Sequence, residues 1–182
     1  MTSYRRARIP GAKFFFTVAL ADRASTLLLG EIDALRYAYA RTRAERPFWC
    51  DAMVVLPDHL HAIWTLPPGD SDFSTRWGAI KSRFTRRIKA SGRMGCNPIL
   101  RSRSKVAKGD AGIWQRRFWE HCIRDERDYR DHMAYCWGNP VRHGLVEHPT
   151  DWPYSSIHRD IRAGRVDQKW FGVPTDGAFG EP

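Results

Sequence analysis

Residues 54–66 read VVLPDHLHAIWTL, two β-rich runs joined by Pro57-Asp58. Proline followed by aspartate favours a tight turn, so the two runs are predicted to be neighbouring strands of one sheet. Side chains alternate between the two faces of a strand. His59 and His61 therefore share one face, and the opposite face is apolar: Leu60, Ala62, Trp64 and Leu66. The apolar face is predicted to be core, and the other begins with two imidazoles close enough to hold one divalent cation.

The rest of the chain supplies further strands and helices around this pair. Strands are predicted at residues 14–20, 48–56, 59–66 and 113–123, and helices at residues 31–44, 73–88 and 126–139. Asp125 is the expected cap of the last helix, which should end before Pro140. The order β-α-β-β-α-β plus a final helix predicts a ferredoxin-like α+β fold. Its antiparallel sheet carries two helices on one face, and the opposite face is free for chemistry.

Length and composition favour one soluble domain over residues 1–182. We expect a basic, flexible insertion at about 90–112 and a turn-rich C-terminal tail at about 141–182. No run of about 18 apolar residues is present, and the basic N-terminus lacks a signal-peptide cleavage pattern. The four cysteines show no C-x-x-C or zinc spacing, so we expect a cytoplasmic protein with reduced thiols.

Positive charge is concentrated in one part of the chain. The formal net charge is +10, and ten lysines and arginines lie between Lys81 and Lys108 with no acidic residue among them. Such a local excess is typical of a nucleic-acid footprint, although a solvated surface loop would look the same. The predicted 73–88 helix should present its cations outward from the side opposite its apolar stripe: Arg76, Lys81, Arg83, Arg86 and Arg87.

The last predicted helix carries the second group of candidate reactive residues. Tyr135 and Asn139 are four residues apart and therefore share a helical face, with Asp128, Asp131 and His132 roughly along the same side. A phenol beside a metal-binding amide is what a metal-assisted tyrosine nucleophile requires. The alternatives are that Tyr135 is an ordinary core residue and that the two histidines lie on a half-exposed strand without a metal.

Four motifs together resemble the REP-associated tyrosine transposases, which belong to the HUH single-strand nucleases. They are VVLPDHLHAIWTLP (54–67), FWEHCIRDERDY (118–129), HMAYCWGNPVRHGLV (132–146) and DWPYSS (151–156). The resemblance implies that His59 and His61 are metal ligands for Mg²⁺ or Mn²⁺ and that Tyr135 forms a 5′-phosphotyrosine link. Asn139 stands where relatives place a polar third ligand, and Glu120 or His121 is a second candidate for that position.

The substrate implied by this resemblance is single-stranded DNA folded into a hairpin, as in repetitive extragenic palindromes of bacteria. Five arginines would position its phosphates: Arg5, Arg6, Arg83, Arg86 and Arg87. Trp152 and Tyr154 could stack on unpaired bases, but packing is the expected role. Asp58 either orients His59 or only forms the turn. The other histidines (143, 148 and 158) are expected to face solvent.

Three hypotheses follow from these observations. The first is a metal-dependent enzyme that cleaves and rejoins DNA through Tyr135. The second is a domesticated hairpin-DNA-binding protein with little or no cleavage activity. The third is a metal phosphodiesterase that uses activated water and leaves Tyr135 structural. All presumed catalytic positions are present, which favours the enzyme, acting as a monomer or as a homodimer.

Overall fold

The computed structural model describes residues 8–92, 111–172 and 179. Within the described ranges the elements follow the predicted order, with short helices that were not predicted after the first strand (α1) and after α5 (a 3₁₀ helix and α6). They are β1 (Lys13–Ala19), α1 (Leu27–Gly30), α2 (Ile32–Glu45), β2 (Trp49–Val55), β3 (His59–Thr65), α3 (Phe73–Ala90), β4 (Trp119–Cys122), α5 (Glu126–Arg142), a 3₁₀ helix (Pro149–Asp151) and α6 (Ile157–Arg162). The α+β, ferredoxin-like prediction is confirmed. Arg5, Arg6 and most of the basic insertion lie outside the described residues.

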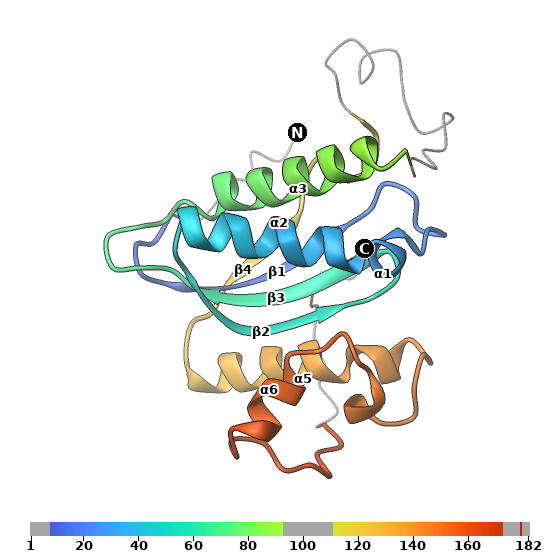
Figure 1. Ribbon diagram of the computed structural model, residues 1–182. Coiled ribbons are helices and arrows are strands. Elements are labelled where there is room, and N and C mark those ends of the chain that lie inside the picture. Colours follow the sequence, from blue (N-terminus) through green and yellow to red (C-terminus); the bar gives the residue numbers. More distant parts are fainter. Residues whose placement is uncertain (1–7, 93–110, 173–178, 180–182) are drawn as a thin grey trace, which may run out of the picture.

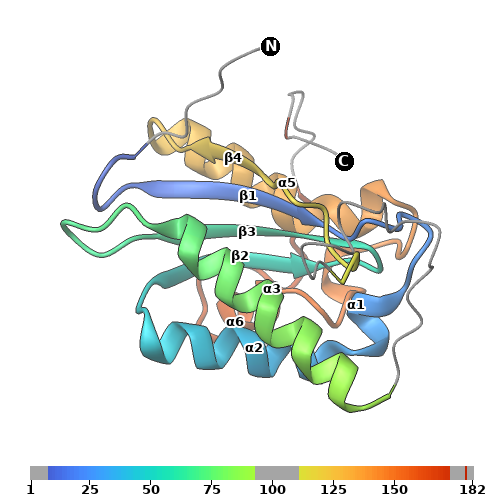
Figure 2. The same ribbon diagram turned by 90° about the horizontal axis from the view of Figure 1, so that it is seen from above.

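The four strands form one antiparallel sheet in the order β2-β3-β1-β4, seen from above in Figure 2. The predicted turn at Pro57-Asp58 joins β2 to β3. In the central pair, Thr17 of β1 lies opposite His61 of β3, and Ala19 lies opposite His59. The imidazole pair therefore occupies a central strand, where the sheet holds its position.

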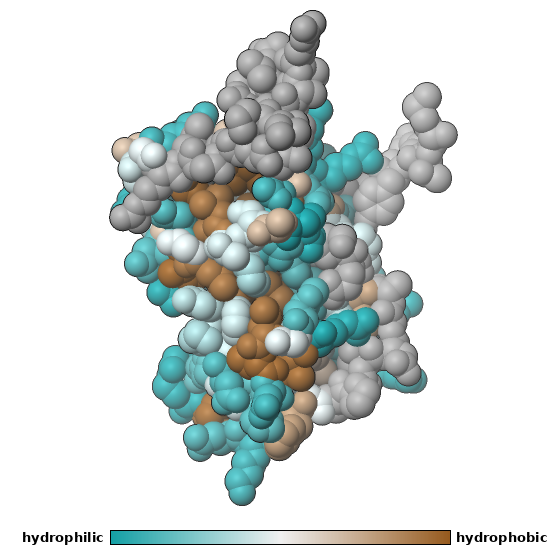
Figure 3. All heavy atoms as spheres, turned by 90° about the vertical axis from the view of Figure 1, so that its right-hand side faces the viewer, coloured by the Kyte–Doolittle hydropathy of each residue, from teal (hydrophilic) through white to brown (hydrophobic). Residues whose placement is uncertain are grey.

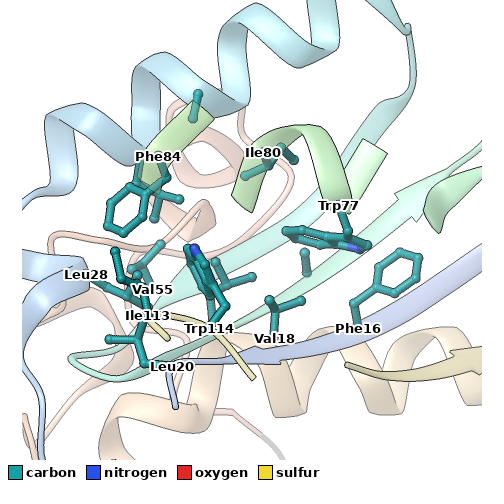
Figure 4. Packing of buried hydrophobic residues seen from close by; sticks show 14 of the residues in the cluster. Phe16, Val18, Leu20, Leu28, Val55, Trp77, Ile80, Phe84, Ile113 and Trp114 are labelled. Carbon is teal, nitrogen blue, oxygen red and sulfur yellow. The ribbon is translucent and has the colours of Figure 1, made fainter. Parts of the chain in front are cut away.

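The predicted apolar face of the sheet packs against α2 and α3. Phe16 and Val18 of β1 meet Trp77 and Ile80 of α3 in this core (Figure 4). The indole rings of Trp64 and Trp77 stack with their centroids 4.1 Å apart and 16° between their planes. Asp72 caps α3, since its side chain accepts from the backbone N–H of Thr75. This layer fixes the orientation of β3 and hence of its opposite face.

The opposite face of the sheet is not free, which corrects the prediction. Helices α5 and α6 lie across it, so the sheet is enclosed between two helical layers (Figure 1). A second apolar core includes Phe15, Val54 and Ile63 from the sheet and Cys136 from α5. His59 and His61 are consequently buried. The prediction failed because the alternation of polar and apolar residues on β3 was interpreted as exposure, whereas the histidines face a helix.

Two predicted boundaries were also wrong. The strand expected at 113–123 is regular only over β4, and Trp114 forms an isolated bridge with Leu20. Helix α5 continues past Pro140 to Arg142. A proline inside a helix removes one backbone donor, but its fixed φ is itself helical. The turn after Pro140 is held by the hydrogen bond from the His143 N–H to the Asn139 carbonyl (3.0 Å).

The chain after α5 returns to cover the outer edge of β2. The backbone N–H of Val55 donates to the Tyr154 carbonyl (2.9 Å). Arg159 donates to the carbonyls of Cys50 (2.8 Å) and Asp51 (2.6 Å). The predicted turn-rich tail therefore packs against the sheet. Within the described ranges, no helix is both long and apolar enough to cross a bilayer.

Candidate active site

Each of the two histidines of β3 is held in place by a neighbouring oxygen atom, and their rings lie almost perpendicular, at 82°. The His59 Nδ1 lies 2.8 Å from the Asp58 carboxylate, and the His61 Nδ1 lies 2.9 Å from the Thr17 hydroxyl. The Thr17 hydroxyl donates to the Phe179 carbonyl (3.3 Å), so its oxygen accepts from His61. Both rings therefore carry their proton on Nδ1, which leaves the buried Nε2 atoms as the nitrogens that can bind a cation. Asp58 thus orients His59 as well as forming the turn.

Burial keeps both imidazoles in the neutral form that binds metal. It lowers the pKa of His59, although the hydrogen bond with Asp58 opposes this effect. It lowers the pKa of His61 well below the usual value, with a further contribution from the nearby His59. At neutral pH a divalent cation therefore does not have to displace a proton from the nitrogen that binds it. The donor set fits a transition metal, Mg²⁺ or Mn²⁺.

Helix α5 brings Tyr135 and Asn139 to this pair. The Tyr135 and His61 ring centroids are 5.2 Å apart, in an edge-to-face arrangement. Asn139 is fully buried, and its interaction with His61 raises the His61 pKa against the larger effect of burial. The Tyr135 hydroxyl is buried and has no hydrogen-bond partner among the described residues. The structure therefore assembles the predicted phenol, amide and imidazoles in one place; their catalytic roles stay predictions.

Phe179, near the end of the chain, covers the candidate nucleophile. Its ring stacks on Tyr135 with centroids 4.1 Å apart and 17° between the planes, and its edge contacts His132. With this cover in place, Tyr135 is only 3% exposed. No local pattern in the sequence relates residue 179 to residue 135, so this contact was not predicted.

Two further residues at the end of α5 reach the site, and neither was predicted to do so. The Arg142 guanidinium lies 5.6 Å from the Tyr135 ring centroid, and the His143 ring lies 5.2 Å from the His59 ring. Residues seven positions apart share a helical face, so the spacing of Tyr135 and Arg142 was the available signal. This spacing was not considered, because the helix was expected to end before Pro140. His143 was expected only to face solvent; it is exposed but its ring also contacts the His59 ring.

The alternative third ligands lie elsewhere. Glu120 is paired with Phe16 in the sheet and therefore shares its face, toward α2 and α3 and away from the imidazoles. His121 is on the imidazole side but donates to Asp128 (2.8 Å) and stacks on His132 with centroids 4.6 Å apart. Asn139 is thus the candidate whose side chain reaches His61.

His121, Asp128 and His132 form a separate cluster whose ligand atoms all lie within 4.8 Å of one another, near enough for one metal ion. The two rings are almost parallel, however, at 8°, so their nitrogen lone pairs lie in different planes. Arg124 also donates to Asp128 (3.1 Å). Although burial raises the pKa of Asp128, hydrogen bonds from Arg124 and His121 outweigh it and hold that pKa well below its usual value. The cluster links β4 to α5 through hydrogen bonds.

The predicted outward display of cations on α3 is partly wrong. Arg76 is only 3% exposed and donates to the Pro47 carbonyl and to the Asp70 carboxylate. Arg83 is paired with Glu45 and donates to Thr42. Thr42 and Glu45 belong to α2, which packs beside α3, and Pro47 follows the end of α2, so this helix and its C-terminal segment supply acceptors to the polar side of α3.

Arg86 and Arg87 are exposed, with Arg87 over the Tyr37 ring at 4.4 Å. Helix α3 lies on the face of the sheet opposite α5 (Figure 1). The arginines that were predicted to contact DNA on α3 are therefore not part of the imidazole–tyrosine site.

Trp152 packs rather than presenting its ring to solvent, as expected. It is 8% exposed, and its indole N–H donates to the Val55 carbonyl (2.9 Å). The Tyr154 ring contacts it edge-on at 5.6 Å. His158 hydrogen-bonds to the Trp152 carbonyl (2.7 Å), which corrects the expectation that this histidine only faces solvent.

The arrangement defines a class of protein: an antiparallel α+β domain whose last long helix sets a tyrosine beside two histidines of a central strand. The REP-associated tyrosine transposase of Escherichia coli K12 is 45% identical over 181 residues, covering 100% of this chain and 98% of that protein. A relative from Haemophilus influenzae is 41% identical over 174 residues, covering 96% of each. The chain belongs to the REP-associated tyrosine transposases.

A solved structure of a REP-associated tyrosine transposase bound to a REP hairpin has the same fold. It superposes with a TM-score of 0.83 at 44% identity, covering 100% of this chain and 98% of that one. No family model matches the chain.

Proposed function

We propose that this protein is a metal-dependent endonuclease and strand transferase that acts on single-stranded, REP-like hairpin DNA through a 5′-phosphotyrosine at Tyr135. One observation carries the proposal: the Tyr135 phenol, the Asn139 amide and the His61 imidazole converge in one buried site. The REP hairpin held by the similar solved structure supports the choice of substrate.

His59 and His61 would hold a divalent cation, Mg²⁺ or Mn²⁺, through their Nε2 atoms, and Asn139 would add its side-chain oxygen. The orientation of both rings by Asp58 and Thr17 supports this assignment. Such a cation polarises a phosphodiester oxygen and stabilises the charge that develops on the leaving oxygen.

Tyr135 supplies the nucleophile in this proposal. The phenolic oxygen attacks the scissile phosphorus, a new oxygen–phosphorus bond forms, and the bond from phosphorus to the 3′-oxygen breaks. The phenolic proton passes to solvent, and the released 3′-oxygen takes up a proton to become a hydroxyl. The reverse attack by a 3′-hydroxyl rejoins the strand and frees the tyrosine. The Arg142 guanidinium over the Tyr135 ring stabilises the phosphate as it approaches.

The α3 side of the molecule would contact the DNA backbone. A shallow cavity of about 350 Å³ beside α3 is lined by cations and has no acidic residue in its wall: Lys81, Arg86, Lys89 and Arg116. Phosphate contacts of this kind position a nucleic acid without reading its sequence. Arg86 and Arg87 fit this role because they are exposed. Arg83 contributes less because it is paired with Glu45.

Incubation of the protein with labelled hairpin oligonucleotides and Mn²⁺ or Mg²⁺ tests the proposal. We expect a covalent protein–DNA adduct on a denaturing gel, dependent on the cation and lost in Tyr135→Phe. Tyr39→Phe is the matched control, since it removes a phenol from α2, on the opposite face of the sheet. Adducts that persist in Tyr135→Phe would refute the assignment. Cleavage without any adduct, abolished by His59→Ala but kept by Tyr135→Phe, would indicate attack by water.

A second candidate function is hairpin binding without cleavage. The Phe179 ring on Tyr135 favours it, because a covered phenol cannot reach a phosphate. This candidate predicts that wild-type protein binds the hairpin, with affinity falling steeply in salt, and forms no adduct under any cation.

A further inference from the structure

We propose that Arg23 is a positioning residue of the metal site: it holds the Asp58 carboxylate, which in turn holds His59 in the orientation that binds the cation. The inference rests on the proposed function, because it concerns the cation that His59 and His61 would bind. Arg23 lies in the loop between β1 and α1, far from β3 in the sequence. The fold brings this loop to the turn that precedes His59.

The two oxygens of the Asp58 carboxylate have different partners. Oδ1 lies 2.8 Å from the His59 Nδ1, and Oδ2 lies 2.6 Å from the Arg23 Nε. A carboxylate that is held at both oxygens cannot rotate without breaking one of the two contacts. Arg23 therefore fixes the plane of the Asp58 carboxylate, and this carboxylate fixes which nitrogen of His59 carries the proton.

The backbone of the Pro57-Asp58 turn is held independently of the Arg23 side chain. The Leu20 N–H donates to the Asp58 carbonyl (2.8 Å), and the Leu28 N–H donates to the Pro57 carbonyl (3.2 Å). The turn should keep its shape in a variant that lacks the guanidinium. What such a variant loses is the second contact of the Asp58 side chain.

Arg23 also acts on the site through its charge, in the opposite direction. Burial lowers the pKa of His59 and of His61, and the Arg23 charge adds to this effect, so the same charge also repels a bound cation. The Arg23 side chain is 35% exposed and paired with Asp58, so solvent and the carboxylate screen this repulsion. Loss of a group that orients a metal-binding histidine lowers metal affinity more, commonly by about 10- to 100-fold. We therefore expect positioning to outweigh repulsion.

Mn²⁺ binding to the protein without DNA, followed by the electron paramagnetic resonance signal of free Mn²⁺, tests the assignment. We expect Arg23→Gln to raise the Mn²⁺ dissociation constant about 5-fold or more, less than the loss of a group that contacts the histidine directly. Arg23→Lys should restore part of this loss, because an ammonium group can still pair with the carboxylate. Arg36→Gln is the matched control, because Arg36 is exposed and paired with Asp33 on α2.

A double-variant comparison separates positioning from a purely structural role. Asp58→Asn alone should weaken Mn²⁺ binding more than Arg23→Gln does, because it removes the charge that contacts His59. In the Asp58→Asn background, Arg23→Gln should have no further effect, because Arg23 acts through that carboxylate. Urea unfolding should be nearly the same for Arg23→Gln and wild type, since a partly exposed ion pair contributes little to stability.

Nitrogen NMR of the histidine side chains reports the positioning without any metal. We expect His59 of wild type to be a single tautomer with its proton on Nδ1. Arg23→Gln should give a mixture of the two neutral tautomers of His59. The signals of His61 should stay as in wild type, because Thr17 and not Asp58 holds that ring.

The inference is overturned if Arg23→Gln binds Mn²⁺ as tightly as wild type or more tightly, or if it still weakens binding in the Asp58→Asn background. Should wild type bind no Mn²⁺ without DNA, the NMR comparison decides, and an unchanged His59 tautomer in Arg23→Gln overturns the inference.

These results are separable from the proposed function. Adduct formation through Tyr135 with no effect of Arg23→Gln on Mn²⁺ binding or on the His59 tautomer would refute the positioning role alone. Mn²⁺ binding that depends on Arg23 in a protein that forms no adduct would refute the enzyme and support the positioning role.

Discussion

Thr17 takes no direct part in the proposed chemistry, yet it determines which nitrogen of His61 carries the proton. Its hydroxyl donates to the Phe179 carbonyl and accepts from the His61 Nδ1–H. Groups that orient a metal-binding histidine in this way commonly contribute 10- to 100-fold to metal affinity. The site therefore depends on residues of β1 and of the C-terminal tail as well as on the histidine pair.

Replacing Thr17 with valine should lower the apparent affinity of the site for the cation. The fold should be retained, because the two side chains are similar in shape. We expect the Mn²⁺ concentration for half-maximal adduct formation to rise by about 10- to 100-fold, and hairpin affinity in EDTA to be unchanged. Thr65→Val is the control, since Thr65 donates to Asp51 and not to a histidine. An equal rise in both variants would argue against an orienting role for Thr17.

The sequence could predict which residues share a face, but not what covers them. Strand alternation placed His59 with His61, and helical spacing placed Tyr135 with Asn139; the structure has both pairs as predicted. The approach of Tyr135 to His61 depended on the family resemblance, since periodicity does not say how α5 crosses the sheet. Phe179 was outside the reach of sequence patterns, because its contact with Tyr135 is set only by the path of the tail.

At the scale of single elements, β4 and α5 are joined by the buried carboxylate of Asp128. It accepts hydrogen bonds from the His121 ring (2.8 Å) and from the backbone N–H of Arg124 (2.9 Å). Asp125 caps the same end of α5 by accepting from the Asp128 N–H (2.8 Å). The N-terminus of α5 is thereby tied to an edge strand, and the position of the whole helix over the imidazoles depends on it.

Asp128→Asn should lower the free energy of unfolding at neutral pH by about 1–3 kcal/mol, because a buried charged acceptor is lost. The pKa of Asp128 is held well below its usual value, so its contribution is fully present above about pH 4 and is lost as the pH falls further. Urea unfolding of the variant and of wild type, at neutral pH and at acidic pH, measures the two free energies of unfolding.

The difference between the variant and wild type should shrink in acid. Asp131→Asn, at a half-exposed position of the same helix, should have little effect at either pH. A pH-independent difference for Asp128→Asn would show that the carboxylate charge is not the cause.

Element boundaries were the least predictable feature at this scale. Proline usually marks a helix end, yet Pro140 lies inside α5, and the additional turn delivers Arg142 and His143 to the site. In the same way, the alternation at 113–123 predicted one long strand. Only Trp119–Cys122 pairs with β1, because Trp114 forms its bridge with Leu20, beyond the end of β1.

At the scale of the molecule, the candidate site lies between layers. Tyr135 is enclosed by the sheet, by α5 and by the tail residue Phe179. Figure 3 shows that the surface at the end of the molecule on the right of Figure 1 is mixed, with apolar patches between hydrophilic residues. Because the Phe179 ring stacks on Tyr135, the proposed attack on DNA requires that this ring move away from the phenol.

Phe179→Ala should accelerate adduct formation on hairpin DNA, because the ring that stacks on Tyr135 is removed. The Phe179 backbone carbonyl that accepts from Thr17 is retained, so metal dependence should be unchanged. The rate of adduct formation under single-turnover conditions measures the effect. Phe171→Ala removes an exposed aromatic of the same segment and should leave the rate as in wild type. A slower reaction in Phe179→Ala would mean that the ring supports the tyrosine instead of blocking it.

The covering of β2 by residues 154–159 also bears on self-association. An open outer strand presents unpaired backbone groups that a strand from another chain can extend. Here Tyr154 and Arg159 already bond to those groups, so two copies cannot merge their sheets through β2 while this segment stays in place. The same closure protects the folded protein against strand-to-strand aggregation from that side.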